Sequence, residues 1–317
     1  MNRSDSLIGK SLKRCHPGNG EGDSPSDRMA CVNAGQLPGT AASDSPFPPS
    51  PRTIYHKNPL AEVVCQVQFP TLLRVDVEPP AEYQERIRSD YPVLKDKSNE
   101  LLGLPPDLPP LVASLLRSPA ARQKPQAAYD FVSEDGIWTV SLTRNFLALA
   151  TTKYHTWEQF KEHLARPLKA LIDVYTPSWF SRVGLRYQDL VRRSTLNLTD
   201  RSWSELLKQP IAGLLAAPDL KATVIQTLTQ TLIQLPDGIG NVNLRHGLIQ
   251  SADNGETCYL IDNDFFTDQQ TRPTDVYAKL DYFNRQSGRL FRWCITNILD
   301  KAMEPELVAP AGDGGHV

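Results

Sequence analysis

Cysteine is scarce in the sequence, and its arrangement excludes the cysteine-based scaffolds. Five cysteines occur in 317 residues, an odd number with no C-x-x-C pair. Neither a disulfide framework nor a thiolate zinc site is therefore indicated, and we predict no bound metal and no cofactor. Cys65, Cys258 and Cys294 lie within strand-like or helix-like patterns, where a buried free thiol is the expected state.

Long apolar runs and an excess of positive charge are also missing. No continuous apolar stretch is long enough to cross a bilayer, and the first residues lack the hydrophobic core of a secretory signal. These absences predict a cytoplasmic protein with no membrane partner. The formal net charge is -2, whereas a protein that grips nucleic acid by its phosphates needs a basic surplus. Nucleic acid is accordingly disfavoured as a partner.

Catalytic motifs are absent as well. The sequence contains no G-x-S-x-G, no G-x-x-x-x-G-K-S/T and no G-x-G-x-x-G after a strand pattern. His155 and His163 are too far apart for the one-turn spacing of the H-E-x-x-H metal motif. No catalytic residue is predicted, and a non-enzymatic role is favoured.

The chain divides into four segments by composition and periodicity. Residues 1–52 are rich in Ser, Pro, Gly and small side chains without periodicity, and such a segment cannot bury enough apolar surface to offset the entropy of ordering it. We predict that it is disordered. The order strand, helix, three-stranded meander, long helix then occurs twice, in residues 53–178 and 179–304, and residues 305–317 form a flexible C-terminus.

Apolar periodicity places the elements of the two halves. Alternating residues predict strands, and apolar spacings of three and four predict helices. Strands are expected at 60–69, 127–133, 137–143, 146–152, 181–191, 222–235, 243–250 and 258–266, and helices at 81–91, 157–175, from 200 or 202, and at 274–303. The result is an α+β fold: a curved, largely antiparallel sheet of about eight strands from a duplicated β-α-β-β-β-α unit, with two long helices packed on one face.

Charged side chains gather on the face of this sheet that the helices leave uncovered. Within Ser181–Val191, alternation places apolar residues on one face and Arg182 and Arg186 on the other. The tripeptide D-N-D places Asp262 and Asp264 on the same outer face, about 7 Å apart by strand geometry. These four residues are the candidate ligand-binding residues.

Two interpretations of the four residues differ in their chemistry. The carboxylates can hold a divalent metal or act as acid and base in a nucleotidyltransferase-like site, and the arginines can clamp an anionic ligand in bidentate fashion. Alternatively, the two aspartates pair with the two arginines across the sheet. No Gly-Ser phosphate-binding motif precedes D-N-D, and no third acidic residue stands at a matching position. Ion pairing is therefore favoured over a metal site.

A second feature is the run V-I-Q-T-L-T-Q-T-L-I-Q-L, which has a strong tendency to form a strand. As an exposed edge it would invite pairing with another chain. We predict a non-catalytic protein-interaction module, in which the broad sheet face or this Thr/Gln-rich strand docks against a second copy or a neighbouring protein. The alternative is a ligand-binding or phosphoryl-transfer domain that uses the four charged residues.

Four segments resemble a family of sporadically distributed, uncharacterised bacterial proteins of similar size: N-P-L-A-E-V-V-C-Q-V-Q-F-P, G-I-W-T-V-S-L-T-R-N-F, R-V-G-L-R-Y-Q-D-L and Y-L-I-D-N-D-F-F. The resemblance runs through nearly the whole chain after Ile54. It implies no activity and no catalytic residues, because none is established for that family, whose patchy distribution resembles that of defence or toxin–antitoxin genes. Such proteins often have Asn after the G-L-R-Y segment, where this chain has Asp189.

Overall fold

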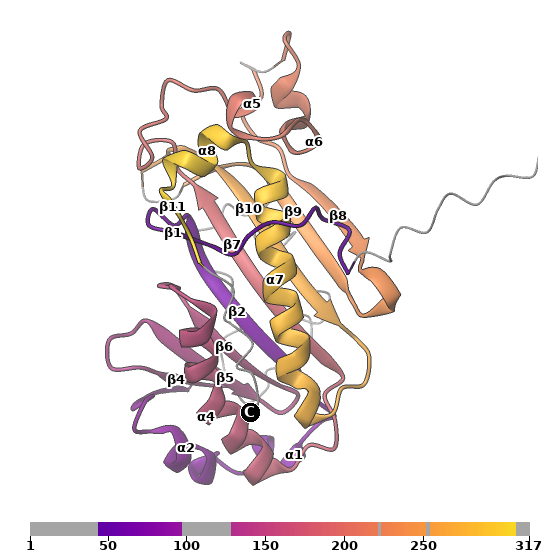
Figure 1. Cartoon of the computed structure of the whole chain (residues 1–317). Coiled ribbons are helices and arrows are strands. Elements are labelled where there is room, and N and C mark those ends of the chain that lie inside the picture. Colours follow the sequence, from indigo (N-terminus) through magenta and orange to yellow (C-terminus); the bar gives the residue numbers. More distant parts are fainter. Residues whose placement is uncertain (1–43, 97–127, 221–222, 252–253, 309–317) are drawn as a thin grey trace, which may run out of the picture. The chain divides into compact units, whose positions relative to one another are not determined.

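The framework of the protein is an antiparallel sheet of nine strands in the order β3-β4-β5-β6-β2-β7-β10-β9-β8 (Figure 1). The computed structural model describes residues 44–96, 128–220, 223–251 and 254–308. The predicted α+β fold with a large antiparallel sheet is confirmed, and β3 is the strand that periodicity did not indicate. The strands are β2 (Leu60–Gln68), β3 (Val93–Asp96), β4 (Ala128–Val132), β5 (Trp138–Thr143), β6 (Phe146–Thr151), β7 (Arg182–Val191), β8 (Thr229–Gln234), β9 (Asn241–Gln250) and β10 (Thr257–Thr267).

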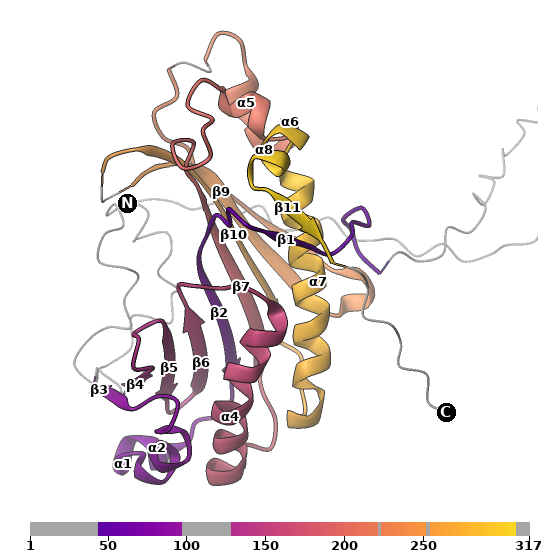
Figure 2. The same cartoon turned by 60° about the vertical axis from the view of Figure 1, so that its left-hand side comes forward.

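Two long helices, α4 (Trp157–Tyr175) and α7 (Val276–Cys294), lie on the same face of the sheet (Figure 2). Apolar residues recur at three- and four-residue spacing in both, so that one side of each helix is buried. No helix in the described part of the chain is long and apolar enough to span a membrane. The shorter helical elements are α1 (Leu73–Val77), α2 (Ala81–Ile87), α5 (Trp203–Leu206), α6 (Gln209–Ala212), α8 (Asn297–Ala302) and the 3-10 turns η2 (Gly213–Ala216), η3 (Pro236–Gly238) and η4 (Pro273–Asp275).

The main core lies between the sheet and these helices. Val63, Leu185, Phe265 and Leu280 come from β2, β7, β10 and α7, and each has 0% of its surface exposed. Full burial of such a side chain is worth about 1.5–3 kcal/mol. The three cysteines predicted to be buried, Cys65, Cys258 and Cys294, are buried free thiols.

The two halves of the sheet have the same strand order around its centre. In the first half β2 pairs with β6, the last strand of its meander, and in the second half β7 pairs with β10. Each meander leads into a long helix, and β2 and β7 lie antiparallel to each other at the centre. The origin of this arrangement by duplication of one unit stays a prediction.

The strand expected at 222–235 is shorter than predicted, because the chain before it crosses another strand. The structure begins β8 at Thr229. Just before it, the Thr227 carbonyl oxygen lies where a side chain at Gly247 of β9 would project, 1.9 Å from an added Cβ. The glycine leaves room for this crossing. Leu228 then packs on a small apolar cluster that covers one end of the face opposite the helices, and that cluster comprises Ile249, Cys258 and Leu260.

The helix expected at 274–303 is interrupted near its C-terminal end. Ile295 leaves the helical conformation and forms a β-bridge with Leu207. Thr296 donates from its hydroxyl to the Glu205 carbonyl at 2.7 Å. These partners lie about ninety positions earlier in the chain, so periodicity within the helix could not reveal them. The segment therefore forms α7 and α8 rather than one helix.

Part of the predicted disordered tail is packed against the fold. Residues 44–51, which we call the N-terminal strap, run along α7. Phe47 is only 5% exposed and lies between the rings of Phe265 and Trp293, with ring centroids at 6.5 and 6.3 Å. The Asp44 carbonyl accepts a hydrogen bond from the Tyr282 hydroxyl at 2.8 Å. The prediction of disorder is therefore wrong for residues 44–52, and residues 1–43 lie outside the described part.

The C-terminal segment also begins in a regular element. β11 (Pro305–Leu307) pairs antiparallel with β1 (Thr53–Tyr55) in a small two-stranded sheet. The predicted flexible segment 305–317 is thus wrong for its first three residues. Residues 309–317 lie outside the described residues.

Candidate functional site

The four predicted charged residues come together on the open face, by which we mean the face of the sheet opposite α4 and α7. Antiparallel pairing of β7 with β10 sets Arg186 opposite Asp264, and Gln188 opposite Asp262. Arg182 lies further along β7 on the same face. We call these four side chains, together with Arg245 of β9, the Arg/Asp cluster.

Asp262 is the centre of the cluster. Its carboxylate accepts two hydrogen bonds from Arg186, at 2.7 and 2.8 Å, in bidentate geometry. Arg245, which lies opposite Asp262 in the register of β9 and β10, approaches the same carboxylate at 2.9 Å. The Asp262 side chain is 0% exposed and the Arg245 side chain 9% exposed. A buried carboxylate is thus held between two guanidinium groups, which is the arrangement that makes burial of such charges tolerable.

Asp264 has its own partner, Arg182, at 2.8 Å. The guanidinium of Arg182 also donates to Gln66 at 3.3 Å and lies over the ring of Phe266, 4.8 Å from its centroid. It reaches this position because it folds back over Gly184, where an added Cβ would lie 2.4 Å from the Arg182 side chain. Because Gly184 has no side chain, the guanidinium of Arg182 has room to lie over it.

We expect that Gly184→Ala will lower the free energy of unfolding by about 1–2 kcal/mol, because the methyl group would displace Arg182 from its charged partner. Urea unfolding followed by circular dichroism measures the change. The matched control is Gly288→Ala in α7, where an added Cβ meets no atom within 4 Å. A helical Gly→Ala change there should stabilise by about 0.5–1 kcal/mol. A Gly184→Ala variant at least as stable as the native chain would show that the position of Arg182 over Gly184 does not contribute to stability.

Burial shifts the pKa values of several charged groups on the open face. It raises the pKa of Asp264, with Arg182 and Arg186 opposing the shift. It raises the pKa of Glu62 on β2 in the same way, with Arg186 opposing. It lowers the pKa of Arg245, with Asp262 opposing. The open face therefore balances its arginines against nearby carboxylates rather than presenting an excess of either sign.

The chemistry open to this cluster follows from how fully its charges are paired. Both aspartates accept from arginines, and within residues 44–96, 128–220, 223–251 and 254–308 no group of three His, Cys, Asp or Glu side chains is placed to hold a metal. Two buried polar atoms beside the pairs, Arg245 Nε and Asn243 Oδ1, have no hydrogen-bond partner among the described residues. The geometry favours the ion-pair interpretation, and a ligand-binding role for the four residues stays a prediction.

Arg245 was missed by the sequence analysis. Alternation within N-V-N-L-R-H places it on the same face as Asn241 and Asn243, so the face that its side chain joins was predictable from the sequence. Its partner was not, because the register of β9 against β10 depends on the turn between them. That register is what sets Arg245 opposite Asp262.

The second predicted feature, the Thr/Gln-rich run, forms the last strand of the sheet. β8 pairs with β9 on one side, and the strand order gives it no neighbour on the other side among the described residues. Five of its six residues are exposed, and Leu232 has 65% of its surface exposed. In Figure 1, β8 marks the end of the sheet beyond β9.

The backbone of β8 directs alternate residues to the free edge. The Leu235 N–H, immediately after the strand, donates to the Gly240 carbonyl at 2.9 Å. Since successive residues of an antiparallel strand point their N–H and C=O groups to opposite sides, odd-numbered residues face β9. The even-numbered residues, whose backbone groups face the free edge, are Gln230, Leu232 and Gln234.

No known family model matches this chain, and no match is found among curated proteins. The resemblance to a sporadically distributed bacterial family therefore stays a prediction.

Proposed function

We propose that the protein is a non-catalytic interaction module that self-associates by pairing β8 with β8 of a second copy. The two sheets would join edge to edge into one continuous antiparallel sheet. The observation that carries the proposal is that β8 is an exposed strand whose outer edge has no neighbouring strand in the described part of the chain.

Support comes from what β8 lacks. Proteins that keep an edge strand free of partners protect it with charged side chains, prolines or bulges. The strand Thr229–Gln234 reads T-Q-T-L-I-Q and contains none of these residues, and its pairing with β9 runs without a register shift. Its edge is therefore open to hydrogen bonding by another strand.

The sequence of β8 also suits pairing with itself. In a two-fold antiparallel pair centred on Leu232, each Leu232 meets the other on the axis, and Gln230 meets Gln234 on either side. All three are residues whose backbone groups face the edge, so each of these pairs exchanges two hydrogen bonds. A register centred on Thr231 or Ile233 uses fewer of the outward-facing groups. We therefore propose the Leu232-centred register.

A neighbouring protein that adds its own strand to β8 is the other partner consistent with this edge. A ligand-binding or phosphoryl-transfer role for the Arg/Asp cluster has less support, because its arginines already bind its aspartates at 2.7–2.9 Å. A defence or toxin–antitoxin context rests on the family resemblance alone.

The Leu232-centred register can be tested by introducing charges of either sign at Leu232. Leu232→Lys and Leu232→Glu each place like charges opposite one another on the axis, and like charges directly opposite destabilise a strand pair. We expect the native chain to sediment as a dimer and each variant alone as a monomer. An equimolar mixture of the two variants should form a heterodimer, because Lys and Glu then face each other. Analytical ultracentrifugation measures all three samples.

Val77→Lys is the matched control, because Val77 is also exposed, at 78%, and lies in α1 away from β8. It should leave the dimer intact. A native chain that stays monomeric, or dimers that persist in both Leu232 variants, would overturn the proposal. Native mass spectrometry of protein purified from its own host adds one more outcome: a different protein bound to the native chain, and lost in Leu232→Lys, would identify a heterologous partner instead.

A further inference from the structure

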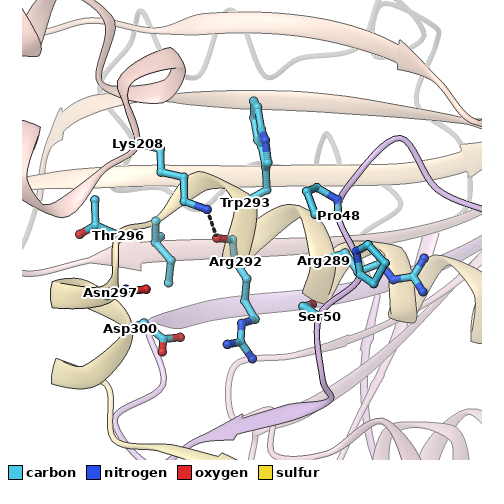
Figure 3. A pocket seen from close by; sticks show the side chains of 11 residues that line it. Pro48, Ser50, Lys208, Arg289, Arg292, Trp293, Thr296, Asn297 and Asp300 are labelled. Atoms are coloured by element: carbon cyan, nitrogen blue, oxygen red, sulfur yellow. Dashed lines mark hydrogen bonds between the residues drawn. The ribbon is translucent and has the colours of Figure 1, made fainter. Parts of the chain in front are cut away.

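A pocket of about 180 Å³ lies where the N-terminal strap crosses the C-terminal end of α7 (Figure 3). The strap forms one wall, the last turns of α7 form the floor, and the start of α8 and the loop before α6 complete the rim. Charged residues in the wall are mostly cations: Lys208, Arg289 and Arg292, against the single carboxylate of Asp300.

Two carboxylates lie near these cations, Asp300 in the pocket wall and Asp44 on the strap. Asp300 accepts a hydrogen bond from the Tyr55 hydroxyl at 2.7 Å. Arg289 pairs with Asp44 of the strap at 2.7 Å, and Asp44 is largely exposed, with 60% of its side chain in solvent. Asp44 and Asp300 together balance two of the three positive charges at most, so the pocket keeps a net positive charge.

Among the residues that the structure describes, the other two cations donate hydrogen bonds to neutral acceptors only. Lys208 donates from Nζ to the Arg292 carbonyl at 3.2 Å (Figure 3), which uses one of its three N–H bonds. The Arg292 guanidinium donates to the Pro51 carbonyl at 3.4 Å and to the Thr53 hydroxyl. Each keeps unused donors, and neither forms an ion pair with a carboxylate among the described residues. Arg292 is half-buried, where a charge interacts more strongly than in open solvent, and Lys208 is exposed at the rim.

From this arrangement we propose that the pocket binds a small anion that carries a phosphate group. A guanidinium presents paired donors that match phosphate oxygens, and an ammonium adds a compact charge. Ser50, Thr296 and Asn297 provide neutral polar groups in the wall, and Trp293 provides an aromatic surface for the organic part of such a ligand. The strap contributes one wall, so the ligand also fixes the strap on α7.

The test uses the full chain and inorganic phosphate as the probe, with calorimetry at constant ionic strength in a chloride buffer. We expect saturable binding to the native chain, and a Kd about tenfold or more higher in Arg292→Gln and in Lys208→Gln, since each removes one charge contact. Methyl phosphate should bind at least as tightly as phosphate. Arg285→Gln is the matched control, because Arg285 lies exposed on the same helix outside the pocket, and it should leave the Kd unchanged.

Three results would overturn the proposal: no saturable phosphate binding, equal affinity in both pocket variants and the native chain, or equal loss of affinity in Arg285→Gln. If Arg292→Gln fails to fold by circular dichroism, Lys208→Gln decides alone. The proposal does not depend on self-association, since Leu232→Lys should bind phosphate as the native chain does. Its failure and that of the β8 dimer are thus separate outcomes.

Discussion

Replacing Asp262 by alanine should lower the free energy of unfolding by about 3–5 kcal/mol, the cost of breaking a buried ion pair by removing one partner. The size of the loss follows from what remains. Arg186 and Arg245 both bind this carboxylate, and neither would have another carboxylate at hydrogen-bond distance in the part of the chain that the structure describes. Two guanidinium groups would stay on the sheet with uncompensated charge. Urea unfolding monitored by tryptophan fluorescence measures the difference.

Asp268→Ala is the control for this change. Asp268 also approaches a cluster arginine, Arg182, but at 4.0 Å and with 67% of its side chain exposed. Exposed pairs of this kind are worth about 0–1 kcal/mol, so the control should be nearly neutral. An Asp262→Ala loss no larger than that of the control would contradict the ion-pair account of the cluster.

The same residues also decide between structural pairing and ligand binding. If the pairing is structural, calorimetry should detect no binding of Mg²⁺ or ATP to the native chain. Replacing both Asp262 and Asp264 by asparagine should then only reduce the stability of the fold. Saturable binding of either probe by the native chain, lost in the double variant, would instead establish the ligand-binding alternative.

Local alternation was sufficient to orient the central strands. In β7 the period of two separates buried Val183 and Leu185 from Arg182 and Arg186, and the structure keeps that division. The same reasoning placed Asp262 and Asp264 on the open face. These predictions succeed because the period of a strand decides which face a side chain joins, and a half-buried sheet enforces that choice.

Features that depend on distant partners were not predictable in this way. The break between α7 and α8 depends on Leu207, which pairs with Ile295. The late start of β8 depends on the chain crossing Gly247 of another strand. The strap looked disordered because it is rich in proline and small residues, yet one aromatic side chain, Phe47, anchors it in the core. In each case tertiary contacts override the local pattern.

A second large change in the free energy of unfolding is expected on substitution of Asp189. It lies on the helix-facing side of β7, is 4% exposed, and has no arginine or lysine partner among the ion pairs of the described residues. Burial, with a smaller contribution from Asp262, holds the pKa of its carboxyl well above the usual range. The folded state therefore binds a proton at this position more tightly than the unfolded state, whose pKa is about 3.9. The free energy of unfolding therefore falls as the pH rises above the unfolded pKa, because the carboxyl ionises in the unfolded chain and stays protonated in the fold.

Asp189→Asn should accordingly increase the free energy of unfolding at pH 7 by about 1–3 kcal/mol, because each unit by which the folded pKa exceeds the unfolded one destabilises the ionisable residue by about 1.4 kcal/mol and an amide has no proton to lose. The gain should shrink as the pH falls through the raised pKa and vanish near pH 4, about where the unfolded carboxyl is protonated too. Urea unfolding across this range measures both the gain and its pH profile.

The control Asp219→Asn makes the same chemical change at an exposed residue. It should leave the free energy of unfolding unchanged across the same pH range. A destabilised Asp189→Asn chain would show that the carboxyl has a favourable partner in the folded state. A gain that does not change with pH would show that ionisation of Asp189 is not its cause. A confirmed gain would mean that the core carries a cost which an amide of the same shape removes.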